Sequence, residues 1–161
     1  MQRADETGTP AIIAILRGLE PDRADSVGST LRSAGIDIIE VPLNSPEPYA
    51  SIAKLSATSG GRGMVGAGTV LDAEQVQRVH DAGGRLIVAP NCDVSVIRAA
   101  LRLGMTVVPG FATATEAFAA LDAGADTLKL FPASTYGPKH LRALREVLPP
   151  KLRIYPVGGI G

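Results

Sequence analysis

The chain has 161 residues, of which 45% are hydrophobic, and this length and composition predict one globular domain with a buried core. Sixteen basic residues balance sixteen acidic ones, which argues against nucleic acid or an anionic membrane as a partner. A single cysteine, Cys92, cannot form an internal disulfide, and no apolar run approaches membrane-spanning length. Together these features predict a cytoplasmic protein.

Strand-like and helix-like segments alternate along the chain after a polar segment at residues 1–10. Apolar runs predict strands within residues 11–16, 36–43, 64–70, 86–90, 105–109, 125–133 and 152–157. Helical spacing and start or stop signals predict helices within residues 21–34, 44–57, 72–82, 94–103, 113–123 and 138–148, with a loop at 136–138. The stop glycines Gly84, Gly104 and Gly124 recur every 20 residues, so the chain repeats one β/α unit.

Such alternation predicts a parallel sheet, either doubly wound or closed into a barrel. No glycine-rich phosphate turn follows the first strand, as a doubly wound fold would offer. Instead, polar or charged residues lie at or near the ends of successive strands, namely Arg17, Glu40, Thr69, Asn91 and Lys129. We therefore predict an α/β fold of the (β/α)8 TIM-barrel type. Residues 11–161 would form the barrel domain with about seven of its eight strands, incomplete at the C-terminus.

Two charged residues, Glu40 and Lys129, interrupt otherwise apolar strands. Because side chains alternate along a strand, Glu40 should face the barrel interior with Ile38, and Lys129 should face it with Thr127. Burial lowers the basicity of a lysine, and a neutral amine can form a Schiff base with a carbonyl substrate. A buried structural ion pair is the alternative for these two residues.

Five strings in the chain resemble the KDPG/KHG aldolases, which are class I, Schiff-base, pyruvate-dependent aldolases on a β/α barrel. The strings are Ile13-Ala14-Ile15-Leu16-Arg17-Gly18, Glu40-Val41-Pro42-Leu43-Asn44-Ser45-Pro46, Gly66-Ala67-Gly68-Thr69-Val70-Leu71, Lys129-Leu130-Phe131-Pro132 and Val157-Gly158-Gly159. The resemblance runs from about residue 11 to residue 161. It implies that Lys129 forms the imine and that Glu40 transfers protons.

The resemblance also implies a substrate-binding set consisting of Arg17, Thr69, Pro90, Phe131, Val157, Gly158 and Gly159. Family members acting on the gluconate epimer typically carry an arginine four residues after the glutamate and a threonine before the glycine pair. This chain has Asn44 and Val157 there, which resembles the branch acting on 2-dehydro-3-deoxy-6-phosphogalactonate. Arg17 would then hold the substrate carboxylate.

The implied reaction cleaves a phosphorylated 2-keto-3-deoxy sugar acid into pyruvate and D-glyceraldehyde 3-phosphate. It would need no metal and no cofactor, and the resemblance implies a homotrimer. Three alternatives stay open at this point: the gluconate epimer as substrate, a non-covalent sugar-phosphate isomerase or synthase on a similar barrel, and an inactive barrel fragment.

Overall fold

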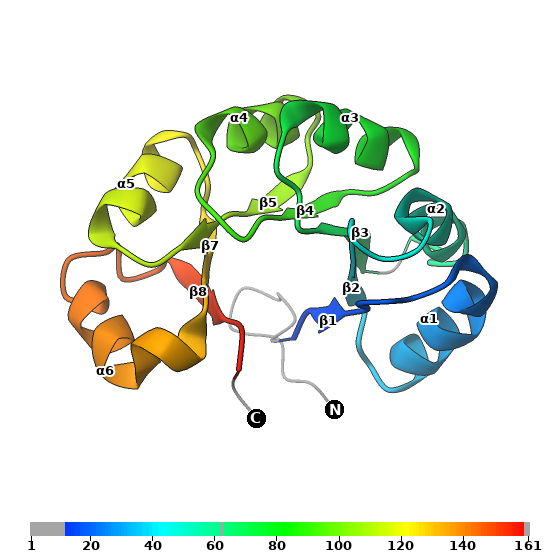
Figure 1. Cartoon of the computed structure of the whole chain (residues 1–161), viewed down its shortest axis with the longest axis horizontal. Helices are drawn as coiled ribbons and strands as arrows, with labels where there is room; N and C mark the ends of the chain where they lie inside the picture. The colour runs from blue at the N-terminus through cyan, green and yellow to red at the C-terminus, as the bar shows by residue number, and fades with distance from the viewer. Residues whose placement is uncertain (1–11, 62, 160–161) are drawn as a thin grey trace.

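The computed structural model describes residues 12–61 and 63–159; the polar segment at 1–10, Ala11 of the expected first strand and residues 160–161 lie outside this part. All strands that pair do so in parallel, in the orders β1-β2-β3-β4-β5 and β6-β7-β8. They are β1 (Ala14–Ile15), β2 (Ile38–Pro42), β3 (Met64–Gly68), β4 (Leu86–Val88), β5 (Thr106–Val108), β6 (Gly110–Phe111), β7 (Thr127–Leu130) and β8 (Arg153–Pro156). The strands follow an arch, with β1 and β8 at its two ends (Figure 1).

The helices form an outer layer around this arch (Figure 1). They are the 3-10 helix η1 (Pro21–Arg23) and the α-helices α1 (Ala24–Ser33), α2 (Pro48–Ala57), α3 (Ala73–Asp81), α4 (Val94–Arg102), α5 (Ala114–Asp122) and α6 (Ala133–Arg145). Each strand except β5 is followed by a helical segment or by the described end of the chain, as the predicted β/α repeat requires. None of the helices in the described ranges is both long and apolar enough to cross a membrane.

Alternation along the strands divides the core into two clusters. Ile39 and Val41 of β2 and Leu128 of β7 belong to the large cluster that includes buried residues of the helices. Ile38 belongs to a smaller cluster inside the arch, with Leu86, Val88 and Val108. Glu40 and Lys129 lie on the same strand faces as this inner cluster, so the predicted inward orientation of both side chains is confirmed.

The predicted fifth strand, at residues 105–109, contains β5, and a second short strand, β6, follows directly after Pro109. β5 pairs with β4 and β6 pairs with β7, so the two short strands together occupy one position in the arch. Pro109 itself accepts a hydrogen bond from Lys129 N at 2.9 Å, but its nitrogen carries no hydrogen to donate. The eight labelled strands therefore fill seven positions. Within residues 12–61 and 63–159, no ladder joins β8 to β1, which agrees with a partial TIM barrel.

One helix start differs from the sequence prediction, and one helical segment is longer than predicted. Helix α2 begins at Pro48 and not at Asn44, because each residue before a proline is disfavoured in a helical conformation and Glu47 has a left-handed φ of 39°. The helical segment α6 is broken at Gly137, where φ is 70° and ψ is 175°, so one helical stretch begins at Ala133 and a second begins after Gly137. The second stretch agrees with the predicted helix start at Pro138, and the short stretch before Gly137 was not expected from the sequence.

Candidate active site

A cavity of about 450 Å³ lies inside the arch at the carboxyl ends of the strands. Glu40 and Lys129 line it together with Val157 and Gly158, so four of the predicted site residues share one cavity. The remaining lining is mostly apolar and comes from β1 and the two residues before it, and from β4, β5 and β8. A largely apolar cavity with a few convergent polar groups is typical of a small-molecule site.

Glu40 and Lys129 are both buried, at 2% and 7% exposure, although neither side chain has a hydrogen-bond partner within the described chain. Nor do the described residues include an ion pair between them within 4.0 Å. Glu40 Oε2 is buried and has no hydrogen-bond partner among the residues that the structure describes. Lys129 Nζ lies 5.0 Å from the centre of the Phe131 ring, which brings this predicted residue to the site as well.

Burial shifts the pKa values of Glu40 and Lys129 in opposite directions, so that the two values come closer to each other. Desolvation raises the pKa of Glu40 from 4.5 to about 7, and the nearby positive charges of Lys129 and Arg17 oppose this rise. Desolvation lowers the pKa of Lys129, Glu40 opposes that change, and Arg17 adds to it. The glutamate can therefore carry or release a proton near neutral pH, while the lysine amine is easier to deprotonate than an exposed one.

Arg17 does not line the cavity, but Asn44 holds its side chain through a hydrogen bond. Its Nη1 donates a hydrogen bond to Asn44 Oδ1 at 2.8 Å across 27 positions of sequence. Directly beside this contact, Gly18 N donates to the buried Ser45 Oγ at 3.0 Å. These two bonds tie the segment after β1 to the segment after β2, so the guanidinium stays near Glu40 and Lys129.

Thr69 follows β3 and has a φ of 57°, in the left-handed region. This conformation is costly for a β-branched residue, and such strain concentrates at functional sites. Thr69 and Pro90 occupy the ends of the neighbouring strands β3 and β4 but do not line the cavity. The structure thus places both residues at the predicted end of the barrel, and their contact with a substrate stays a prediction.

The glycine pair after β8 is fixed against the start of α6. Ala133 N and Ser134 N donate to the carbonyl oxygens of Val157 and Gly158 at 2.8 and 3.0 Å. Gly158 and Gly159 have positive φ values of 95° and 67°, which favour glycine. Within the described part of the chain, neither of their N–H groups has an acceptor, and of the two residues only Gly158 lines the cavity.

Sequence reasoning missed several residues that shape the cavity. Tyr155 lines it from β8 and is the register partner of Lys129, so strand alternation could have identified it. Val88 and Val108 line it from β4 and β5 and could have been found in the same way. The contacts of Asn44 and Ser45 depend on loop conformations, and no local pattern in the sequence indicates them.

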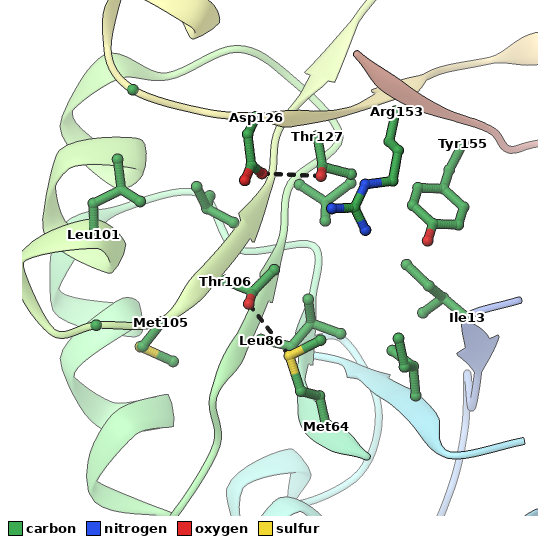
Figure 2. Close-up of a pocket in the computed structure, with 15 residues that line it drawn as sticks. Ile13, Met64, Leu86, Leu101, Met105, Thr106, Asp126, Thr127, Arg153 and Tyr155 are labelled. Carbon is green, nitrogen blue, oxygen red and sulfur yellow. Dashed lines mark hydrogen bonds between the residues drawn. The ribbon is translucent and has the colours of Figure 1, made fainter. Parts of the chain in front are cut away.

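A second cavity, of about 320 Å³, lies at the opposite end of the strands (Figure 2). Its polar groups include Thr127, which donates a hydrogen bond to Asp126 at 3.0 Å, and Thr106, whose hydroxyl lies 3.3 Å from Met64 Sδ. Neither Glu40 nor Lys129 lines it. Among the described residues, no group of three His, Cys, Asp or Glu side chains could hold a metal ion. The chemistry of paired glutamate and lysine is therefore confined to the first cavity.

Comparison with known proteins agrees with this geometry. A family model described as KDPG and KHG aldolase matches residues 5–161. The chain belongs to this aldolase family. The 2-dehydro-3-deoxy-6-phosphogalactonate aldolase of Escherichia coli K12 is 49% identical over 149 residues, which are 92% of this chain and 73% of that protein.

Solved aldolase structures share the fold as well. The structure described as native KDPGal has a TM-score of 0.92 at 47% identity. That alignment covers 99% of this chain and 76% of the KDPGal chain. The KDPG aldolase of Legionella pneumophila, solved with pyruvate captured at low pH as a covalent carbinolamine intermediate, has a TM-score of 0.85 at 29% identity. That alignment covers 92% of this chain and 71% of the Legionella one. The (β/α) barrel architecture predicted from the sequence is thereby confirmed for this aldolase.

Proposed function

We propose that this aldolase cleaves 2-dehydro-3-deoxy-6-phosphogalactonate to pyruvate and D-glyceraldehyde 3-phosphate, with Lys129 as the Schiff-base nucleophile. The observation that carries this proposal is the buried Lys129 amine, which shares a cavity with Glu40 but forms no ion pair with it among the described residues. A salt bridge would hold the lysine protonated, whereas this arrangement leaves the amine able to attack a ketone.

The reaction begins when the neutral Lys129 amine attacks the C2 ketone and forms a carbinolamine. Loss of water gives an iminium ion, whose positive nitrogen accepts electrons from the breaking bond. Glu40 takes the proton of the C4 hydroxyl, the C3–C4 bond breaks, and glyceraldehyde 3-phosphate leaves. The remaining enamine is protonated at C3, and water then hydrolyses the imine to release pyruvate and restore the free lysine. A carboxyl with a pKa of about 7 can accept and return these protons.

The other predicted residues would bind the two ends of the substrate. Arg17, oriented by Asn44, supplies a cation for the carboxylate of the α-keto acid, and Thr69 supplies a hydroxyl for the same group. The N–H groups of Gly158 and Gly159 would bind the phosphate, as glycine-rich backbone turns do elsewhere. Phe131 and Pro90 would form side walls of the substrate pocket.

The choice of the galactonate epimer rests on similarity to the 49% identical E. coli enzyme and on two positions in this site. Asn44 is bonded to Arg17, so an arginine at position 44 would replace this contact with a repulsion between two cations. Val157 lines the cavity and presents no hydroxyl to the substrate. A homotrimer is the assembly we expect, and light scattering after size-exclusion chromatography would measure it.

Borohydride reduction in the presence of pyruvate tests the covalent step directly. We expect a single adduct on Lys129, and none in Lys129→Met, which removes the amine at similar length. An adduct on the exposed Lys54 or Lys151, or no adduct in a folded sample, would contradict the assignment. A non-covalent isomerase would also give no adduct. Cleavage of the two epimers, measured with a glyceraldehyde-3-phosphate coupling enzyme, then tests the substrate.

A further inference from the structure

The strand β3 carries two inward-facing glycines, and the structure gives each a different physical reason. Val65 and Ala67 pack in the large cluster toward the helices, so Gly66 and Gly68 face the interior of the arch. Neither glycine has a positive φ, so backbone conformation alone permits an L-residue at both positions. The requirement for glycine must therefore come from what lies against each Cα.

At Gly66, the neighbouring group is backbone. A Cβ there would overlap the carbonyl oxygen of Leu86 in the adjacent strand β4. This close approach belongs to the sheet itself, because Gly66 and Leu86 are register partners in the β3–β4 ladder. The glycine at position 66 is thus explained by strand packing without reference to the active site.

At Gly68, the neighbouring group is the carboxyl of Glu40. A Cβ there would overlap Oε2 and Cδ of Glu40 and would lie 2.9 Å from Oε1, and these are the three nearest atoms. Glu40 pairs in register with Gly66, and Pro42 pairs with Gly68, so the Glu40 side chain extends along β2 and crosses the space above Gly68. The Glu40 carboxyl therefore occupies the space that a side chain at position 68 would fill.

We propose that Gly68 is a positioning residue for the aldolase reaction. Because Gly68 has no side chain, the space above its Cα, here called the seat, holds the Glu40 carboxyl buried and apart from Lys129. The catalytic part of this inference rests on the proposed function, while the seat itself is a matter of packing. Both oxygens and the carboxyl carbon lie against Gly68, and Oε2 is sealed from solvent. A larger residue at position 68 would displace the carboxyl into the cavity, toward water or toward the ammonium group of Lys129.

The test is a double-mutant cycle with a matched glycine as its control. Gly68→Ala and Gly66→Ala are each made in the wild-type protein and in Glu40→Ala, and thermal unfolding is measured for all of them. We expect Gly68→Ala to lower Tm in the wild type and to lower it much less in Glu40→Ala, where no carboxyl needs to move. Gly66→Ala should lower Tm equally in both backgrounds, because its obstacle is the Leu86 backbone.

Kinetics then separate positioning from a purely structural role. In Gly68→Ala, we expect kcat for aldol cleavage to fall about tenfold or more, as loss of an oriented proton-transfer group does. The acidic limb of the kcat–pH profile should also move to lower pH, because water would stabilise the carboxylate. The charged groups that act on Glu40 are Lys129 from β7 and Arg17 after β1, and both are unchanged in this variant.

Each outcome decides the proposal. Equal Tm losses for Gly68→Ala in both backgrounds would overturn it, as would full activity with an unshifted pH limb. If Gly68→Ala does not fold, then folding of the Glu40→Ala/Gly68→Ala double variant supports the seat, and failure of that variant overturns it. The unfolding cycle needs no substrate, so an absence of aldolase activity in the wild type would refute the proposed function and leave the packing inference to be judged by Tm alone.

Discussion

The burial of Glu40 predicts that this residue makes the folded state less stable as pH rises. Its pKa is raised from 4.5 to about 7, chiefly by desolvation. Between these two values the folded state binds the proton that the unfolded state has lost, so the free energy of unfolding decreases with increasing pH. At about 1.4 kcal/mol for each pKa unit, the full cost reaches about 3 kcal/mol once the carboxyl is ionised in both states.

Glu40→Gln removes this cost while keeping the side-chain volume. Near pH 5 most of the penalty is absent in the wild type, because the folded glutamate is protonated; near pH 8 it is almost fully present. The variant should therefore gain about 2–3 kcal/mol relative to the wild type between these two pH values. Lys129 and Arg17 are unchanged in both proteins, so the comparison isolates the group at position 40.

Urea unfolding at about pH 5 and about pH 8 measures this difference, with the slope of the transition checked for constancy. The same variant should lose turnover by about a hundredfold or more, because it cannot transfer a proton. Substrate binding should weaken far less. A stability difference between the two proteins that does not change with pH would show that Glu40 titrates normally, and the reasoning from burial would then be wrong.

Two further substitutions test the rim of the site. Thr69→Asn should raise the free energy of unfolding by about 1 kcal/mol, because asparagine tolerates the left-handed φ of 57° better than threonine does. The same change should weaken pyruvate binding, because it removes the hydroxyl. Urea unfolding and the yield of trapped pyruvate adduct measure the two effects, and a less stable variant would refute the first. Val157→Thr should shift the ratio of kcat/KM values toward the gluconate epimer by about tenfold, one hydroxyl contact in the cavity. An unchanged ratio would place the choice of epimer at other residues.

The parts of the site that the sequence predicted are those governed by a local period or a local cap. The alternation of side chains along two short strands was enough to predict that Glu40 and Lys129 both face the barrel interior, and the structure places both there. The sequence also contains two capping-box patterns at helix starts, Thr113 with Glu116 and Asp72 with Gln75. The first box is present in full. The second is only half formed, because the Gln75 side chain accepts from Leu71 N and not from the N–H of the cap residue.

The parts that the sequence did not predict depend on contacts between distant segments. The bond from Arg17 to Asn44 joins two loops whose conformations are set by a left-handed glycine and a proline-rich turn. The short helical stretch that begins α6 at Ala133 was missed because a proline in a helical run normally marks a first turn, as Pro138 does for the stretch after the non-helical Gly137. The reason for Gly68 is likewise a contact between two strands, which a sequence pattern in β3 alone does not contain.

These contacts address a conflict in the chemistry of the site. A Schiff-base lysine must be neutral to attack, yet a buried carboxylate at hydrogen-bond distance would hold it protonated. In this structure the carboxyl rests over Gly68, and the described residues contain no ion pair between it and Lys129. The Arg17 charge lowers the pKa of both groups, which favours a neutral amine and limits the rise for the glutamate. Burial therefore raises the pKa of Glu40 and lowers that of Lys129, so the two groups differ less in proton affinity than an exposed glutamate and lysine would.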